Sequence, residues 1–471
     1  MKKIIYILAL LPLWGCSGFL DEVDQDKLIP EKVEHYEALL LKEFNGTYPL
    51  MRTVDHMTDN LVEDPTATTS RKFSVKTTYT WQREIEIDEN GNRISGINSS
   101  WEFMYEDIAI ANYVIELIDD ALGEENQRNY TKGEAYFIRA LSYFNLVNLY
   151  GLPYNEATAN VDLGVPLRDN IGVELTYSRN TVAECYAFIE NDLEKAIELI
   201  TLSAAEKSIW HPNLAACNLL MSRIKLYQQK WDEAIDFADK VIESRSLVKI
   251  TPNAPFVTQS NSEILYSYYT TNPIRLTDDI PFKANPQLIN MYEAKDLRKA
   301  VFFSSIDDGT GRFNYYSNKY IRDTYTELGF ANFRVAEAYL NRAEAYAKKG
   351  ESANALNDIM ALHAKRYSDV SGIVYPSNPT EVLTLVLNER RKEFCFEDHH
   401  RWFDLRRMEN RPEIQHEFTL IENNGTRLGK EVYTLLSNDL NYTLPIPIQE
   451  RNNNPLIRNN ERYEKIPIIV D

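Results

Sequence analysis

Apolar positions recur at three- and four-residue spacing over much of the chain, and one stretch has this pattern with few interruptions. Between Phe333 and Tyr367, alanine, leucine and tyrosine side chains fall on one face of a helix, stop at Gly350 and resume as a second short stripe. Glycine commonly ends helices because it adopts the left-handed conformation readily. The pattern predicts two helices joined by a tight turn, with Ala343 and Ala355 small enough for close packing, as in a tetratricopeptide hairpin.

The same pattern occurs further upstream in two more copies. Residues 214–243 align without gaps when Ala234 is set against Ala355, which puts Trp231 at the turn. An interrupted copy before it has Ala196 at the close-packed position. Because one hairpin cannot bury its own apolar face, we predict that the copies stack, although repeats this degenerate also arise by chance in unrelated amphipathic helices. The predicted hairpins lie near residues 131–200, 213–243 and 333–367.

Two long segments without helical periodicity are predicted to be insertions in this scaffold: residues 45–100 and 244–332. In the first, polar side chains alternate with apolar or aromatic ones between Phe73 and Trp81, which predicts a β-strand. The second is far longer than an ordinary connection and rich in tyrosine. Long ordered insertions in rigid scaffolds commonly carry binding surfaces, so we expect both to contribute to a functional site.

Several helix starts are marked in the sequence. Residues 33–44 are predicted to form the first helix and residues 101–122 a later one. A capping box is a Ser or Thr followed three residues later by Glu, in which each side chain bonds to the other residue's backbone. Capping boxes predict helix starts at Ser99, Thr131 and Thr181.

The first residues are typical of an export signal. Two lysines precede an apolar run that is too short to span a bilayer core of about 30 Å. The run ends in Gly15 and Cys16, which resembles a bacterial lipobox, where the cysteine is acylated; Trp14 departs from that pattern. The alternative is a secreted protein in which Cys16 is incidental. The predicted divisions are a signal peptide (1–15), a lipidated Cys16 with an acidic tether (16–32) and a single domain (33–471).

Composition limits the functions that are possible. The 51 Lys and Arg residues against 70 Asp and Glu give a formal net charge of -19, and no basic stripe suits a nucleic-acid backbone. Cys185, Cys217 and Cys395 lack disulfide or zinc spacing and are predicted to be buried. No GxSxG, Walker or HExxH motif occurs, and the adjacent His399 and His400 would point in different directions on a helix. We predict no metal, no cofactor and no catalytic residue.

Residues 388–407, here called the signature segment, read NERRKEFCFEDHHRWFDLRR and continue a helix predicted to begin at Thr380. Phenylalanine, tryptophan and leucine side chains supply apolar anchors between the charges. Opposite charges also stand three or four residues apart, which permits ion pairs along a helix. The predicted pairs are Arg390 with Glu393, Glu397 with Arg401, and Arg401 with Asp404.

The signature segment resembles the ERR-x-E-F-x-x-E-x-H-R-W-F-D-L-R-R signature of the SusD/RagB family of outer-membrane nutrient-binding lipoproteins. The resemblance extends to Gly18-Phe19-Leu20-Asp21 behind the lipobox, to AEAYLNRAEAY and to the terminal LPIPIQERNNNPLIRNN, while Cys395 and Asp398 depart from the family pattern. It implies a mainly α fold, in which a scaffold of tetratricopeptide-like helical hairpins carries long irregular insertions and a few short strands.

The resemblance also implies a function and a place in the cell. The protein would be lipid-anchored in the outer membrane and face the cell exterior. There it would capture an oligosaccharide or glycan and deliver it to a SusC-like TonB-dependent transporter. Two alternatives stay open: a tetratricopeptide scaffold that binds only its protein partner, and a surface glycoside hydrolase whose paired carboxylates lack a local motif.

Candidate ligand-binding residues follow from the chemistry of sugars. Sugar rings have apolar C–H faces and many hydroxyls, so their binding sites combine exposed aromatic rings with polar side chains. A first group surrounds the predicted strand, and a second lies among the tyrosines of the second insertion. The candidates are Trp81, Tyr79, Arg83, Asp59 and Asp64 in the first group and Tyr268, Tyr269 and Tyr292 in the second.

Overall fold

Helices make up most of the regular structure in the computed structural model, which describes residues 30–44, 54–67, 70–94, 100–172, 176–205, 207–268, 281–319, 328, 331–422 and 426–471. The helices are α1 (Val33–Phe44), α3 (Ser70–Ser74), α4 (Lys76–Tyr79), α5 (Ser100–Leu117), α6 (Glu125–Tyr150), α7 (Val182–Ser203), α8 (Leu214–Tyr227), α9 (Trp231–Ser244), α10 (Pro286–Ile289), α11 (Arg298–Phe302), α12 (Val335–Lys348), α13 (Ser352–Arg366), α14 (Pro379–Phe394), α15 (His400–Arg407) and α16 (Ile448–Asn453). The strands are β1 (Leu61–Glu63), β2 (Ile264–Ser267), β3 (Phe282–Ala284), β4 (Phe303–Asp307), β5 (Phe313–Ser317), β6 (Asn332–Arg334), β7 (Ile414–Ile421), β8 (Arg427–Leu435) and β9 (Ile468–Val470).

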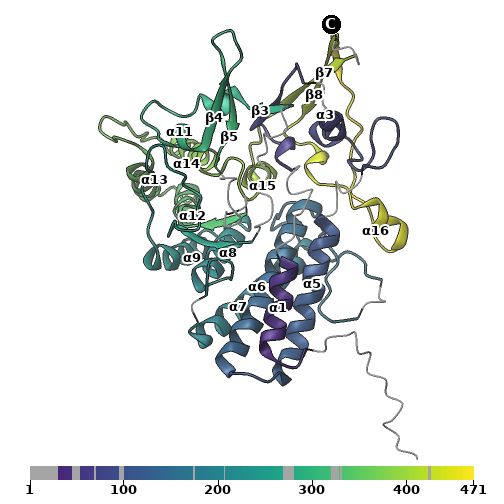
Figure 1. The fold of residues 1–471 in the computed structure, drawn as a ribbon, viewed down its shortest axis with the longest axis vertical. Coiled ribbons are helices and arrows are strands. Elements are labelled where there is room, and N and C mark those ends of the chain that lie inside the picture. The colour runs from purple at the N-terminus through teal and green to yellow at the C-terminus, as the bar shows by residue number, and fades with distance from the viewer. Residues whose placement is uncertain are drawn as a thin grey trace, which may run out of the picture.

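The predicted helix pairs form the scaffold. α6 packs on α7, α8 on α9 and α12 on α13, while α12 also packs on α9 and α7 on α8, so that neighbouring pairs cover one another (Figure 1). The predicted close-packed residues Ala196, Ala234 and Ala355 are fully buried. Gly350 adopts a left-handed φ of 82° between α12 and α13. The mainly α, tetratricopeptide-like fold predicted from the sequence is therefore confirmed.

Only part of the predicted capping pattern is present. Thr181 caps α7: the Glu184 backbone N–H donates to its hydroxyl at 3.2 Å, and the Thr181 backbone N–H donates to the Glu184 carboxylate at 2.8 Å. The prediction for Thr131 is wrong, because α6 begins a full turn and more earlier, at Glu125, and the Thr131 hydroxyl donates to the Gln127 carbonyl. Ser99 lies outside the described residues.

The strand predicted between Phe73 and Trp81 is also wrong. This segment forms the short helices α3 and α4, and Trp81 follows them with a left-handed φ of 53°. All four residues of α4 are buried, and the Lys76 ammonium pairs with Glu431 on β8 at 2.8 Å. Because polar and apolar side chains are both buried here, the alternation did not reflect a solvent-facing side and a core-facing side.

Short sheets join the two insertions to each other and to the scaffold. β1 in the first insertion pairs antiparallel with β3 in the second, with Leu61 opposite Ala284. β2 pairs antiparallel with β6, which leads directly into α12. β4 and β5 form a hairpin, and β7, β8 and β9 form a three-stranded sheet (Figure 1). These pairings place segments far apart in sequence side by side.

The signature segment is two helices and not one. α14 ends at Phe394, and α15 begins at His400 after a link in which Phe396, Asp398 and His399 have left-handed φ values of 57°, 44° and 58°. Arg390 pairs with Asp404 and not with the predicted Glu393, although both Arg390 and Glu393 lie on α14. Glu397, a partner predicted for Arg401, lies in the link and pairs with Arg334 and Lys319. Arg401 binds Asp59 in the first insertion instead.

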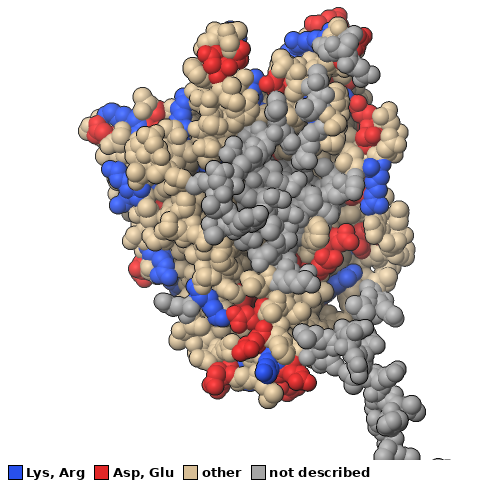
Figure 2. All heavy atoms as spheres, viewed as in Figure 1, with Lys and Arg blue, Asp and Glu red and all other residues tan. Residues whose placement is uncertain are grey.

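The surface and the cysteines agree with the sequence analysis as far as the described residues extend. Cys185, Cys217 and Cys395 are unpaired and buried, as predicted. Acidic and basic side chains are interspersed around the rim of the face in Figure 2. Among the described helices, none is both long enough and apolar enough to span a bilayer.

Candidate functional site

The first group of candidate residues divides between core and surface. Trp81 and Tyr79 are 0% and 1% exposed, and their rings stack against His416 on β7 with centroids 4.2 and 4.1 Å away. The Trp81 indole N–H donates to the Met57 carbonyl at 2.8 Å. The expectation of open aromatic faces at Trp81 and Tyr79 is wrong, since these rings hold the first insertion to the sheet.

The polar members of that group behave differently from one another. Arg401 donates two hydrogen bonds of 2.7 Å to the Asp59 carboxylate, and Arg391 approaches it at 3.2 Å. Burial alone would raise the pKa of Asp59, but the two guanidinium charges hold it at about 2. Asp64 accepts from the Thr66 backbone and hydroxyl, and Arg83 is exposed. Ligand contact by Asp59, Asp64 and Arg83 stays a prediction.

The described tyrosines of the second group are buried as well. Tyr268 is 2% exposed and donates its hydroxyl to Asp398, and Tyr292 is 5% exposed and donates to the Lys392 carbonyl at 2.8 Å. Both rings therefore anchor the second insertion to the signature segment, and the expectation that the rings of Tyr268 and Tyr292 are exposed is wrong, whereas ligand contact by these residues stays a prediction. Tyr269 lies outside the described residues, and its role stays a prediction.

A network of buried ion pairs, here called the Glu393 junction, joins the signature segment to the second insertion and to α13. The Glu393 carboxylate lies 2.7 Å from the Arg334 guanidinium, 2.9 Å from that of Arg366 and 3.3 Å from that of Arg298. All four side chains are 0% exposed. Burial alone would raise the pKa of Glu393, but the three guanidinium charges hold it well below its usual range.

The charges of the junction balance, which argues for a structural role. Cationic and acidic side chains are equal in number, so the network has no surplus charge with which to attract an ion. Its cations are Arg298, Lys319, Arg334, Arg366 and Lys392, and its acids are Glu263, Asp296, Glu389, Glu393 and Glu397. Within the described ranges, no group of three or more His, Cys, Asp or Glu side chains is placed to hold a metal.

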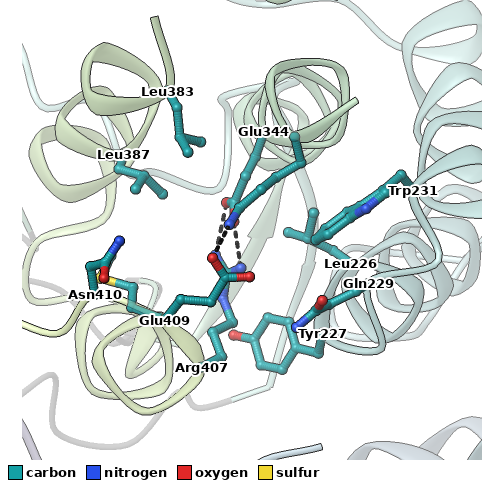
Figure 3. Close-up of a pocket in the computed structure, with 12 residues that line it drawn as sticks. Leu226, Tyr227, Gln229, Trp231, Glu344, Leu383, Leu387, Arg407, Glu409 and Asn410 are labelled. Carbon is teal, nitrogen blue, oxygen red and sulfur yellow. Dashed lines mark hydrogen bonds and ion pairs between the residues drawn. The ribbon is translucent and has the colours of Figure 1, made fainter. Parts of the chain in front are cut away.

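A pocket in the helical scaffold combines aromatic, apolar and polar walls. It encloses about 110 Å³ and is called the Trp231 pocket here. The α8–α9 turn contributes Trp231 and Gln229 on one side, and Leu383 and Leu387 on α14 lie across from them with Asn410 (Figure 3). Trp231 is only partly buried and Gln229 is exposed, so the pocket opens to solvent between these walls.

Two ion pairs lie against the pocket. Arg407 donates to both oxygens of Glu344, at 2.5 and 2.8 Å (Figure 3). The Lys348 ammonium lies 3.2 Å from Glu409. The Glu344 side chain is 2% exposed, whereas that of Glu409 is 62% exposed. The buried Tyr227 hydroxyl beside Arg407 has no hydrogen-bond partner among the described residues.

Two family models match the chain. Residues 18–226 match the model described as "Starch-binding associating with outer membrane", and residues 288–463 match the SusD family model. The chain belongs to the SusD family. SusD-like protein P2 of Formosa agariphila is 25% identical over 534 aligned residues, which cover 98% of this chain and 99% of that protein.

Solved structures of SusD-family proteins share this fold. A SusD superfamily protein from Bacteroides thetaiotaomicron has a TM-score of 0.71 and 24% identity, over 92% of this chain and 100% of that one. A SusD-like carbohydrate binding protein from Bacteroides vulgatus has a TM-score of 0.68 and 20% identity, over 90% and 97% of the two chains. Both helix pairs and insertions therefore belong to an architecture that recurs in the SusD family.

The sequence analysis placed Trp231 at a turn but did not connect it to a pocket. The residue that aligns with it in the α12–α13 hairpin is Ser352, so hairpin packing does not itself require a tryptophan. That difference between repeats was visible in the sequence. The partners from α14 and from the end of α15 were not, because they come from more than 150 residues further along the chain.

Proposed function

We propose that this SusD-family protein is a lipid-anchored protein of the outer cell surface that captures an oligosaccharide and delivers it to a TonB-dependent transporter. The observation that carries the proposal is the match of residues 18–226 to a family described as starch-binding and associating with the outer membrane. Supporting it, a solved relative with the same fold is described as a carbohydrate binding protein. The lipobox-like Cys16 supplies a route to the membrane.

Two carboxyl groups of the core, those of Glu393 and Asp398, can be considered as possible catalytic acids. A glycoside hydrolase needs a carboxylic acid that can donate a proton to the bond it cleaves. The arginines around Glu393 keep that carboxyl ionised. Burial raises the pKa of Asp398 to about 7, but this side chain is 2% exposed and is bound by Tyr268 and Arg223. Neither Glu393 nor Asp398 is therefore placed to donate a proton to a bound sugar.

Affinity electrophoresis tests capture and separates it from the alternatives. The protein is run through native gels that contain single polysaccharides, and each polysaccharide is stained afterwards. We expect slower migration in at least one gel without loss of the polysaccharide. Cleared polysaccharide along the track would instead indicate hydrolysis, and unchanged migration in every gel would favour a scaffold that binds protein alone.

Delivery is tested separately through the partner. Outer membranes are solubilised in mild detergent, and the protein is recovered through an affinity tag at its C-terminus. The proposal expects a TonB-dependent transporter to co-purify in a stable ratio. Recovery of the protein free of any transporter, from cells that produce both, would contradict delivery while leaving capture standing.

A further inference from the structure

The Trp231 pocket lies in the scaffold, away from the residues that the sequence analysis selected. Trp231 packs on the core with part of its surface, but its indole remains only partly buried, and the aligned position in the α12–α13 hairpin carries Ser352. A partly exposed indole can stack on the apolar face of a ligand ring, while neighbouring polar groups bond the hydroxyls at the edge of that ring. The Trp231 pocket therefore offers both an aromatic surface and polar groups to a ligand.

The charges of the pocket select against an ionic ligand. Arg407 is engaged by both oxygens of Glu344, and Lys348 is paired with Glu409. An anion such as a carboxylate or phosphate would need a cation that is free to bind it. Because positive and negative groups here already neutralise each other, a neutral ligand fits better.

Several polar groups remain able to bond such a ligand. Glu409 is 62% exposed, and only one of its oxygens is paired with Lys348. Asn410 and Gln229 are exposed amides that can both donate and accept.

We infer that the Trp231 pocket binds one neutral sugar ring, stacked on Trp231 and hydrogen-bonded by Glu409 and Asn410. Its volume of about 110 Å³ suits a single ring, since sites for drug-sized ligands measure roughly 300–1,000 Å³. The inference takes its ligand class from the proposed function. The ring is either a terminal or branch unit of the captured glycan or a free monosaccharide.

Fluorine NMR of 5-fluorotryptophan-labelled protein tests this site directly. The exported chain carries Cys16→Ala to remain soluble, and the Trp231 resonance is identified by its loss in Trp231→Phe. The probes are methyl glycosides of glucose, galactose, mannose and xylose, with glucuronate and a short neutral peptide alongside. We expect at least one neutral glycoside to move the Trp231 resonance to saturation.

Matched variants show whether the shift reports the pocket. Trp210 is also partly buried, and its resonance, assigned with Trp210→Phe, should stay in place. The double substitution Glu409→Ala and Asn410→Ala removes both proposed hydrogen-bonding groups, one charged and one neutral, and should weaken glycoside binding at least about tenfold. An unchanged thermal midpoint in the double variant would show that the fold is kept, and unchanged affinity would overturn the inference.

The remaining outcomes separate this inference from the proposed function. A protein that polysaccharides retard in gels, but whose Trp231 resonance no neutral glycoside moves, would overturn the pocket and leave capture standing. A saturating shift without retardation in any gel would support a free-sugar site and contradict glycan capture. A response to glucuronate or to the peptide in place of the neutral glycosides would overturn the inferred ligand class.

Discussion

His416 shows at the scale of one residue how the first insertion is held. Its two ring nitrogens lie 2.7 Å from the Tyr79 carbonyl oxygen and 3.0 Å from that of Thr58. Those carbonyls favour the charged ring, but burial has the larger effect and lowers the pKa of His416 to about 4. The imidazole is therefore neutral in the folded protein near pH 7, packed against Tyr79 and Trp81.

We expect His416→Gln to change how stability depends on pH. The pKa of about 4 in the folded protein lies below the ordinary value of 6.5, so the unfolded chain takes up the proton first and stability is lost as the pH falls from 6.5 toward 4. Between pH 7 and pH 5 this group removes about 2 kcal/mol from the free energy of unfolding. Urea unfolding should find the stability difference between wild type and variant smaller by that amount at pH 5.

His35, at a partly exposed position on α1, supplies the control. Its replacement by Gln is measured at the same two pH values, so that the change for His416→Gln is compared with that of a histidine outside the core. A difference for His416→Gln that is independent of pH would show that its pKa is not depressed in the folded state.

Trp81 distinguishes a core ring from a binding ring. Because the indole is 0% exposed and donates to Met57, Trp81→Ala should lower the free energy of unfolding by about 3–5 kcal/mol, as for other buried large-to-small substitutions. Chemical denaturation measures this. A Trp81→Ala variant that kept wild-type stability but was no longer retarded in polysaccharide gels would contradict the burial of Trp81. It would favour the earlier expectation of an exposed ring that binds the ligand.

At the scale of elements, the helical hairpins could be predicted and the connections between them could not. Along the α12–α13 hairpin, apolar side chains recur every three or four residues on one face of each helix. This short-range pattern, together with small residues such as Ala355, is visible in the local sequence. The break between α14 and α15 depends on partners hundreds of residues away, such as Asp59 for Arg401. The alternation between residues 73 and 81 does not mark a strand, because the polar Lys76 and the aromatic Tyr79 are both buried, against β8 and β7 respectively.

The exposure of the candidate aromatic residues was predicted wrongly for the same reason, because it depends on contacts with residues far away in the sequence. A sequence shows that a segment is rich in tyrosine, but not which rings turn inward to bind the signature segment, as Tyr268 and Tyr292 do. The resemblance carried by the signature segment nevertheless identified the family, and residues of that segment help to build the Glu393 junction.

We expect the Glu393 junction to contribute substantially to the free energy of unfolding. In Glu393→Gln the three surrounding arginines would lose their shared negative charge in a site without solvent, and breaking a buried ion pair from one side costs about 3–5 kcal/mol. Urea unfolding measures the loss. Glu417→Gln is the matched control, since Glu417 pairs with Lys430 at the surface and exposed pairs are worth about 0–1 kcal/mol. Equal effects of the two substitutions would contradict a structural junction.

At the scale of the whole molecule, a helical scaffold carries insertions that are tied to it and to each other by β1–β3, β2–β6 and the Glu393 junction. Such a body can present a binding surface without rearranging, which suits capture and transfer of an unmodified ligand. The predicted anchor at Cys16 would keep that surface at the membrane.

Cys16→Ala should release the protein from the membrane. The lipid supplies the attachment in the proposed function, so the variant is expected in the soluble fraction of cells that lack the transporter. Cell fractionation and immunoblotting measure the distribution. Membrane retention of the variant in those cells would contradict lipid anchoring through Cys16.

Capture of an unaltered sugar is the central claim, and equilibrium dialysis with mass spectrometry tests it most directly. Oligosaccharides prepared from the polysaccharide that retards the protein are brought to equilibrium with the protein across a dialysis membrane. Mass spectrometry then measures the amount and chain length of each oligosaccharide on both sides. We predict enrichment of oligosaccharides on the protein side with chain lengths identical to those supplied. Shortened chains, or equal concentrations on both sides for every oligosaccharide, would contradict the claim.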